Sequence, residues 1–330
     1  MAFTSVNQIF EAFNNLNVLV IGDVMLDSYI WGRVDRISPE APVPIIQVKK
    51  RDFRLGGAAN VALNVKALGA NPILCALAGE DEAGKKLLDC LDVEGLSRQG
   101  MIVSKARPTT IKTRVIASHQ HVVRVDEESD AEINQDEESL LIKSIEQILP
   151  ACQVVIFEDY DKGVINEKLI GATVKMAKKL GIPVVVDPKK RNFSSYKNVT
   201  LFKPNLKELR EGLKIEVDPK DLDEVQKAVA KLKSELSASG VLVTLSEHGA
   251  FIDYQDQKVH VKAHVREIAD VSGAGDTVVS IAGLCVALNL DSKLVAALAN
   301  LGGGLVCQHT GVVPIDREEL LTEALKERLI

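Results

Sequence analysis

Short runs of apolar residues recur along the chain, and longer segments with helical periodicity separate them. Apolar runs bounded by turn-forming residues are typical of strands that are buried on both faces of a parallel sheet. The clearest runs are residues 17–23, 72–78, 154–157, 184–187 and 241–245. The pattern predicts an α/β fold with a central, mostly parallel sheet and helices on both faces.

Two segments depart from this alternation. In residues 28–53, two strand-like stretches flank a proline-rich connection, and residues 109–126 also alternate with period two. No helical segment lies between the strands of either pair, so each is expected to form an antiparallel hairpin. These hairpins predict a small β element beside the main sheet.

Composition limits the classes of partner. The chain has 330 residues, of which 46% are hydrophobic and 4% aromatic, so aliphatic side chains must fill the core. This length allows two domains, or one large domain with an appendage. The formal net charge of −6 argues against nucleic acid or a membrane surface as the main partner. The acidic run at 130–138 is expected to be a loop and an exposed helix start.

The cysteines and the apolar stretches indicate a cytoplasmic protein. No Cys-x-x-Cys motif occurs, so we expect reduced thiols rather than disulfides or a zinc site. The first residues lack the basic and apolar regions of a secretory signal. The longest apolar stretch, residues 277–290, is too short to cross a bilayer. The five cysteines are Cys75, Cys90, Cys152, Cys285 and Cys307.

A glycine-rich turn near the end of the chain is the first candidate for chemistry. Gly273, Ala274 and Gly275 precede an apolar helix, whose first turn would carry Asp276. A helix N-terminus with small residues exposes backbone N–H groups that can bind a phosphate. A carboxylate beside it can accept a proton from an attacking hydroxyl, which makes Asp276 a candidate general base. The alternative is a plain helix start with a dipole-complementing acid.

Polar residues also follow the first strand. Asp23 stands at its carboxyl end, where ligands bind in parallel sheets. Gly56 and Gly57 allow close backbone approach before a helix, and Asn60 would lie in that helix's first turn. These residues are candidates for binding substrate hydroxyls. The alternatives are a turn-forming aspartate and tight helix–sheet packing.

A third candidate lies in the middle of the chain. Asn205 and Glu208 are one helical turn apart, after a strand-like run, and could together hold a hydrated magnesium ion. The same spacing also fits a capping box, in which each residue satisfies the backbone of the other. Both interpretations stay open at this point.

In this order, the motifs resemble the ribokinase-like (PfkB-type) carbohydrate kinase family over nearly the whole chain. Residues 37–44, 158–163 and 203–208 are similar to one branch, the kinase domain of bacterial heptose-7-phosphate kinase/heptose-1-phosphate adenylyltransferases. The family usually has a threonine where Val271 or Ser272 stands here, and Glu158 replaces a common serine. Neither departure affects Asp276.

The resemblance implies one kinase domain over residues 1–330, with ATP and Mg²⁺ and an open question about a monovalent cation. Residues 28–53 and 109–126 would form a lid that pairs two subunits into a homodimer, and no adenylyltransferase domain is expected. It places Asp23, Gly56, Gly57 and Asn60 near the sugar. It places near the nucleotide or its metal Asn205, Leu206, Lys207, Glu208, Ser246, Gly249 and Asn300.

The same resemblance implies phosphorylation of the anomeric (C1) hydroxyl of D-glycero-D-manno-heptose 7-phosphate, for ADP-heptose and lipopolysaccharide synthesis. Lys112 and Arg114 would share one face of a lid strand, and we expect them to bind the phosphate already present on the sugar. The alternative is that both are ordinary solvated charges. Two other functions stay open: a kinase of another sugar or nucleoside, and an inactive sugar- or nucleotide-binding regulator.

Overall fold

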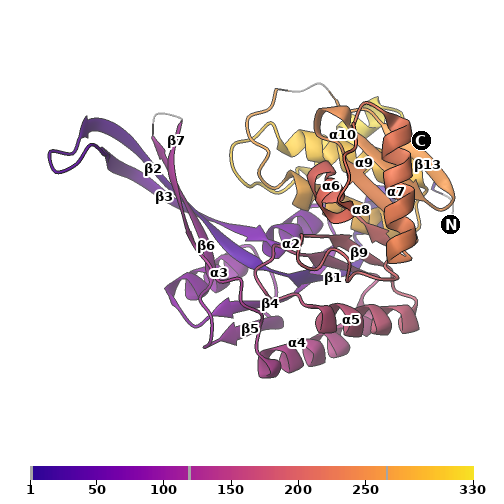
Figure 1. The fold of residues 1–330 in the computed structure, drawn as a ribbon, viewed down its shortest axis with the longest axis horizontal. Helices are drawn as coiled ribbons and strands as arrows, with labels where there is room; N and C mark the ends of the chain where they lie inside the picture. The colour runs from indigo at the N-terminus through magenta and orange to yellow at the C-terminus, as the bar shows by residue number, and fades with distance from the viewer. Residues whose placement is uncertain (1–2, 118–119, 265–266) are drawn as a thin grey trace.

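A nine-stranded sheet forms the centre of the protein in the computed structural model, which describes residues 3–117, 120–264 and 267–330 (Figure 1). The strand order is β13-β12-β11-β10-β9-β8-β1-β4-β5. Pairing is parallel from β11 through to β5, and only β12 and β13 are antiparallel. This confirms the predicted, mostly parallel sheet. The strands are β1 (Asn17–Gly22), β4 (Asn71–Gly79), β5 (Gly100–Ser104), β8 (Val154–Glu158), β9 (Val184–Asp187), β10 (Leu201–Phe202), β11 (Gly240–Thr244), β12 (Ala250–Tyr254) and β13 (Gln257–Val261).

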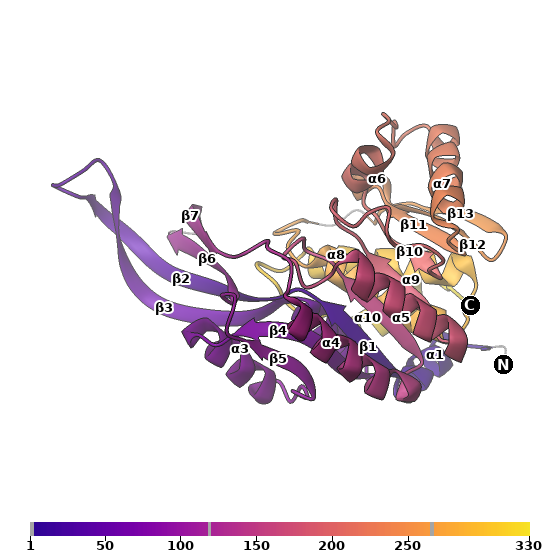
Figure 2. The ribbon, with the colours of Figure 1, turned by 60° about the horizontal axis from the view of Figure 1, so that its bottom comes forward.

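Helices cover both faces of this sheet (Figure 2). One core contains buried residues of α1, α2, α3, α8, α9 and α10, and the other contains those of α4, α5, α6 and α7. The helices are α1 (Val6–Phe13), α2 (Ala58–Ala67), α3 (Glu82–Val93), α4 (Gln135–Ile148), α5 (Glu167–Leu180), α6 (Leu206–Leu213), α7 (Leu222–Leu236), α8 (Ala274–Ala287), α9 (Ser292–Val306) and α10 (Arg317–Lys326).

Strand β1 shows why its sequence is continuously apolar. Val18 and Val20 belong to one core, whereas Leu19 and Ile21 belong to the other. Because successive side chains of a strand point to opposite faces, a strand between two helical layers needs apolar residues at every position. The run at the start of the chain is therefore a consequence of the layered fold.

A second, four-stranded sheet projects from the body (Figure 1). Its order is β3-β2-β6-β7, and the parallel pairing of β2 with β6 joins the two predicted hairpins. The strands are β2 (Val24–Ile37), β3 (Pro44–Gly57), β6 (Thr110–Ala117) and β7 (Gln120–Glu127). Residues 118 and 119 of the second predicted hairpin lie outside the described residues.

The first hairpin is longer than the predicted 28–53. Strand β2 already begins at Val24, with only Asp23 between it and the end of β1 at Gly22. Val24, Met25, Leu26 and Asp27 are all buried, so this part of β2 lacks the alternation of exposed and buried positions by which the rest was recognised. Burial at the junction therefore concealed the start of the strand.

The predicted loop and exposed helix start in the acidic run are confirmed only in part, because Gln135 and Asp136 are exposed but the next two acids are not. Helix α4 begins within it, but Glu137 and Glu138 are buried. Glu137 accepts the N–H of Asn134 in a capping box, and Glu138 accepts hydrogen bonds from Asn166 and Lys168. Paired carboxylates can be buried because these contacts replace their hydration.

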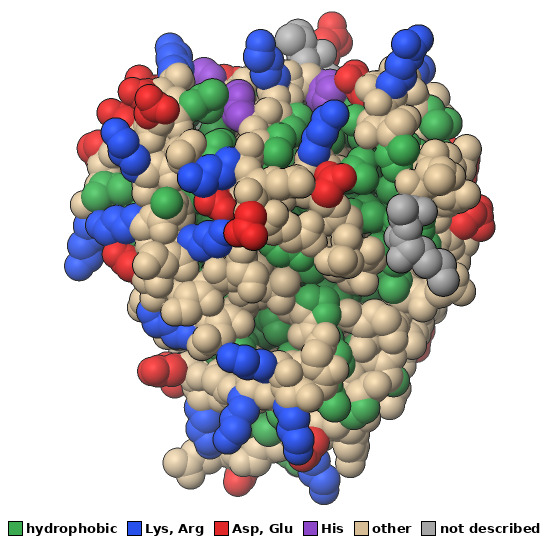
Figure 3. Space-filling view, turned by 90° about the vertical axis from the view of Figure 1, so that its right-hand side faces the viewer, with side chains coloured by type: hydrophobic (Ala, Val, Ile, Leu, Met, Phe, Trp, Pro, Cys, Tyr) green, Lys and Arg blue, Asp and Glu red, His purple; other side chains and the backbone are tan. Residues whose placement is uncertain are grey.

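The surface away from the second sheet is mixed in charge. Figure 3 shows basic and acidic side chains interspersed on that end of the molecule. Within the described ranges, no helix is both long and apolar enough to cross a membrane. All five cysteines are free thiols, as expected.

Candidate active site

Helix α8 begins at the predicted glycine-rich turn. Gly273 is its N-cap, with a φ of 81° in the left-handed region that glycine tolerates best, and no side chain caps the terminus. A Cβ on Gly275 would lie 3.3 Å from an Asp187 oxygen and 3.8 Å from Lys203 Nζ. The first turn therefore lies directly over a buried charged pair. Its backbone N–H groups carry the positive end of the helix dipole, which suits an anion.

Asp276 is buried and held from two sides. Asn60 Nδ2 donates to one carboxylate oxygen at 2.7 Å, and the Tyr160 hydroxyl donates to the other at 2.9 Å. Burial raises the pKa of Asp276 to about 6, against the lowering effect of these two hydrogen bonds. A carboxylate with such a pKa is ionised at neutral pH and can accept a proton there.

Tyr160 is the residue of this group that the sequence did not identify. It belongs to the polar cluster that follows β8, and the cluster alone predicts no role for any one member. Burial raises the pKa of Tyr160 well above its ordinary value, and the nearby Asp276 and Glu158 raise it further. The phenol therefore stays protonated and acts as a hydrogen-bond donor.

Charged residues gather at the carboxyl ends of β8, β9 and β10. Glu158 and Asp187 are direct partners in the parallel register, so their side chains share the face that α8 covers. Lys203 Nζ lies 2.8 Å from an Asp187 oxygen, and both side chains are almost fully buried. Among the described residues, neither Glu158 oxygen has a hydrogen-bond partner. Burial, followed by Asp187 and Asp276, raises the pKa of Glu158 well above its ordinary value.

The capping box at α6 is present. Asn205 accepts the N–H of Glu208 at 2.9 Å, and Glu208 accepts the N–H of Asn205 at 2.8 Å. The other Glu208 oxygen accepts a hydrogen bond from Lys189 Nζ at 2.8 Å. Leu206 and Lys207 begin the helix between them. In the described part of the chain, no group of three or more potential metal-ligating residues occurs, so a bound Mg²⁺ would need oxygen ligands from the substrate phosphates.

The remaining nucleotide candidates lie near the far strands of the sheet. Asn205 forms an isolated parallel bridge with Thr244, at the end of β11. Ser246 and Gly249 follow that strand with positive φ values of 54° and 87°, and Asn300 of α9 donates to the Lys262 carbonyl at 3.0 Å. The fold thus brings the predicted mid-chain motif close to Ser246.

Asp23, which was predicted to lie near the substrate, holds a loop. Its carboxylate is buried and accepts the N–H groups of Tyr160, Lys162 and Val164 at 2.8–3.1 Å. Burial raises the pKa of Asp23, although these three hydrogen bonds act in the opposite direction. Asp23 therefore fixes the loop that carries Tyr160 next to Asp276.

The two glycines allow close packing where β3 ends. A Cβ on Gly56 would overlap the Asp27 carboxylate, and one on Gly57 would overlap the Asp23 backbone. Gly57 is the N-cap of α2 and has a φ of 59°. Asn60, two residues into that helix, then points its amide at Asp276. The glycines contribute to the site by letting α2 start so close to β2.

Lys112 and Arg114 share a face of the second sheet, as predicted. In the register, Tyr29 lies beside Arg114, and the Tyr29 hydroxyl accepts the N–H of Val312, so this face is turned toward the body. Arg114 pairs with Asp27, and Lys112 lies 3.3 Å from Asp126 and 3.0 Å from Glu128. A bound phosphate would have to compete with these carboxylates.

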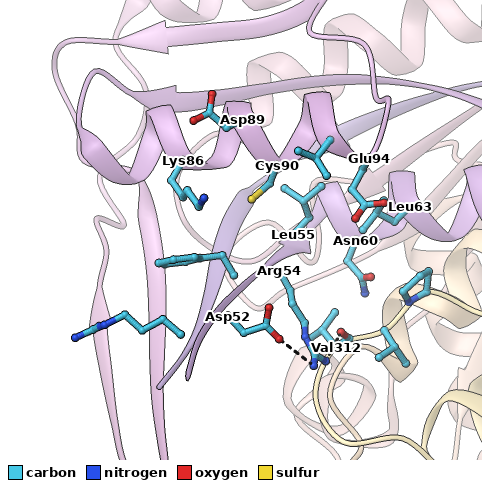
Figure 4. A pocket seen from close by; sticks show the side chains of 15 residues that line it. Asp52, Arg54, Leu55, Asn60, Leu63, Lys86, Asp89, Cys90, Glu94 and Val312 are labelled. Carbon is cyan, nitrogen blue, oxygen red and sulfur yellow. Dashed lines mark hydrogen bonds and ion pairs between the residues drawn. The ribbon is translucent and has the colours of Figure 1, made fainter. Parts of the chain in front are cut away.

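A cavity of about 520 Å³ lies along the edge of β3, and Figure 4 shows the side chains that line it. It is lined by residues of β3, α2, α3 and the segment at 312–314, and Lys86 and Cys90 face it from α3. Asn60 is the one predicted site residue that borders it. Asp276, Asp23 and Tyr160 do not line this cavity, but Asn60 connects it to them through its hydrogen bond to Asp276.

Curated relatives are similar to this chain over most of its length. The chain is 40% identical over 309 residues to the "Bifunctional protein HldE" of Desulfatibacillum aliphaticivorans, covering 93% of this chain and 63% of that protein. It is 39% identical to the HldE of Campylobacter curvus, covering 95% and 66%. The chain thus spans somewhat less than two thirds of the length of these relatives.

Solved structures agree on the fold. Phosphofructokinase-2 from Escherichia coli in complex with potassium superposes with a TM-score of 0.77 at 22% identity, covering 96% of this chain and 99% of that one. Arabidopsis thaliana ribokinase complexed with ribose and ATP gives 0.71 at 18% identity, covering 93% and 98%. Residues 15–318 match the pfkB family of carbohydrate kinases. With the buried aspartate at the uncapped start of α8, these matches identify the chain as a phosphotransferase that belongs to the pfkB carbohydrate kinase family.

Proposed function

We propose that this kinase transfers the γ-phosphoryl group of ATP to the anomeric hydroxyl of D-glycero-D-manno-heptose 7-phosphate. The observation that carries the kinase chemistry is the ionisable, buried Asp276 beside the uncapped N-terminus of α8. The choice of sugar is supported by the HldE proteins, which are similar to this chain over most of its length. The heptose motifs at 158–163 and 203–208 point in the same direction.

In the proposed reaction, Asp276 accepts the proton of the sugar hydroxyl as its oxygen attacks the γ-phosphorus. A bond forms from the sugar oxygen to phosphorus, the bond from phosphorus to the β–γ bridging oxygen breaks, and ADP leaves with that electron pair. The N–H groups at Gly273–Gly275 would stabilise the negative charge on the transferred group. Asn60 and Tyr160 hold the base in place.

The residues present fit a divalent cation held jointly with phosphate. Glu208, Asn205 and Asp187 supply hard oxygen donors at one edge of the sheet, and Asp187 Oδ1 has no hydrogen-bond partner in the described chain. Magnesium, when bound, would neutralise negative charge on the phosphates. Lys189, now paired with Glu208, is the cation that would compete with it. A monovalent cation is a further candidate, since one structural neighbour is described in complex with potassium.

We also propose that the second sheet acts as a lid and pairs two subunits. Its body-facing side carries Asp27, Lys112 and Arg114, while Ile30, Val115 and Val123 form one row on the opposite side. Val123 and Val125 are 49% and 50% exposed, and every residue of the edge strand β7 is exposed. An exposed apolar face with an open edge favours a second copy as the partner.

Binding of a substrate phosphate by the lid allows a direct test of whether the substrate is heptose 7-phosphate. Wild-type enzyme should prefer heptose 7-phosphate to unphosphorylated heptose by well over tenfold in kcat/KM, because a desolvated charge pair discriminates strongly. Lys112→Ala or Arg114→Ala should lose much of this preference. Arg124→Ala is the matched control, since Arg124 lies in the same cross-strand row but is largely exposed.

Two outcomes would count against heptose 7-phosphate. Equal use of both sugars by the wild type would favour a kinase of a plain sugar or nucleoside. No turnover with any sugar, despite ATP binding, would favour a binding regulator. Melting temperatures must accompany the Arg114 variant, because it leaves the buried Asp27 without its cation. Phosphorus NMR of the product would show whether the new phosphate is on C1.

A further inference from the structure

We infer that Tyr160 is a positioning residue that orients the Asp276 carboxylate for proton transfer. This inference rests on the proposed role of Asp276 as the general base. Tyr160 stands 116 positions before Asp276, in the loop after β8, and its hydroxyl reaches Oδ1 at 2.9 Å.

The two donors to Asp276 come from opposite parts of the fold. Asn60 approaches Oδ2 from α2, and Tyr160 approaches Oδ1 from the edge of the sheet. A carboxylate oxygen has two acceptor sites, so each oxygen keeps one for an incoming hydroxyl. With both donors in place, the carboxylate plane cannot rotate freely, which is the preorganisation that general-base catalysis needs.

The position of Tyr160 is itself fixed by several contacts. Its own N–H and those of Lys162 and Val164 donate to the buried Asp23 carboxylate. The ammonium group of Lys189 lies 5.1 Å from the centre of the Tyr160 ring, a cation–π distance. Because its backbone and its ring are both fixed, the Tyr160 hydroxyl can keep the Asp276 carboxylate in one orientation.

The charges around Asp276 explain why a hydrogen bond there should affect its chemistry. Burial and Asp187 raise its pKa, whereas Asn60, Tyr160 and Lys189 lower it. A donor to the ionised form favours that form, so loss of the Tyr160 hydroxyl should make Asp276 a group that protonates at higher pH. The other titratable groups facing this cluster are Glu158 at the end of β8 and Lys203 at the end of β10.

The test is Tyr160→Phe, with Tyr196→Phe as the control. Tyr196 is buried and donates its hydroxyl to Asp159 at 2.8 Å, so the control removes the same atom from a neighbouring buried carboxyl. In Tyr160→Phe, the acid limb of the pH profile of kcat/KM should move up by about one to two pH units. This shift corresponds to the free energy of one hydrogen bond to a charged group. kcat on the plateau should fall about tenfold. The control should leave the acid limb where it is in the wild type.

A measurement without substrate separates this inference from the proposed function. The protein is prepared with carbon-13-labelled aspartate, and the Asp276 carboxyl resonance is identified as the one that disappears in Asp276→Asn. The titration midpoint of this resonance should rise in Tyr160→Phe. An unchanged midpoint and an unchanged acid limb would overturn the positioning role. If instead Asp276→Asn retains normal turnover, the general-base assignment fails while the NMR result still stands.

Discussion

At the scale of single residues, burial of the Asp276 carboxylate destabilises the folded protein at neutral pH. Its pKa is about 6 in the folded protein against an ordinary 3.8, so the folded state binds the proton more tightly than the unfolded state. Stability therefore falls as pH rises between these values, and at neutral pH the ionised group costs about 2–3 kcal/mol. With Asp276 as the proposed general base, activity should have the opposite pH dependence, because only the ionised form can accept a proton.

Asp276→Asn should separate these two effects. We expect kcat to fall by about two to four orders of magnitude, with a small change in KM, because the proton acceptor is lost. The melting temperature at pH 7 should rise, since the amide is neutral and can still pair with Asn60 and Tyr160. Steady-state kinetics and thermal unfolding between pH 5 and pH 8 measure both.

The difference between the two proteins should shrink toward pH 5, where the wild-type carboxyl is mostly protonated. In the wild type, kcat/KM should decline below about pH 6. A variant with near-normal kcat would remove Asp276 from the mechanism. A variant less stable than the wild type at pH 7 would show that the negative charge stabilises the fold instead.

Residue identity predicted part of this site and missed the rest. The small residues 273–275 and Asp276 form a local pattern, because a helix start and its anion site involve consecutive positions. Tyr160 and Lys189 carry no local signal of this kind. Their importance comes from contacts with side chains far away in the chain, which the folded sheet brings together.

At the scale of elements, two helices begin with the same device. Asn134 with Glu137 caps α4, and Asn205 with Glu208 caps α6. The sequence spacing predicted the second box, but it could not distinguish capping from metal binding because both use the same atoms. The structure adds a difference: Glu208 also pairs with Lys189 at the catalytic edge, while Glu137 accepts a hydrogen bond from Ser104.

Glu208→Gln should therefore raise the magnesium concentration needed for half-maximal rate several-fold. Glutamine keeps the capping box, so the fold should remain intact, but it removes the charge that a cation needs. Glu137→Gln makes the same change in the other box and should leave the magnesium dependence unaltered. If both variants lose only a similar amount of thermal stability, Glu208 is a capping residue and nothing more.

Strand lengths show where element prediction stops. The five apolar runs of the main sheet were recognised because their burial on both faces leaves a continuous pattern. The start of β2 is buried by the body, so it has no period-two pattern and was missed, whereas the short strand β10 was recognised as a strand-like run. Pairing of β2 with β6 joins segments about eighty residues apart, and no local pattern encodes it.

At the scale of the whole molecule, the lid face raises the question of assembly. We expect a homodimer at micromolar concentration, in which the row of Ile30, Val115 and Val123 is covered by a second copy. Val125→Glu places a charge on this face and should shift the sedimentation coefficient to that of a monomer. Val103→Glu, on β5, changes an equally exposed valine away from the lid and should leave the dimer intact.

Kinetics of the same variants show whether assembly matters for catalysis. A wild-type monomer with full activity at micromolar concentration would reject the lid dimer. So would a Val125→Glu protein that sediments like the wild type. The fold class and lid segments were predictable for one chain, but whether a second chain completes the lid depends on a surface whose partner the sequence does not name.

The junction of the two sheets restricts how this protein could change its length during evolution. One residue, Asp23, separates β1 from β2, and its carboxylate also fixes the loop that carries Tyr160. An insertion at this junction would displace the start of β2 and also the loop that carries Tyr160 next to Asp276. The hairpin tip around 38–43 is largely exposed, so it can gain or lose residues without reaching the body. Related kinases should therefore differ in the length of this hairpin and share the geometry of its base, where it joins the main sheet.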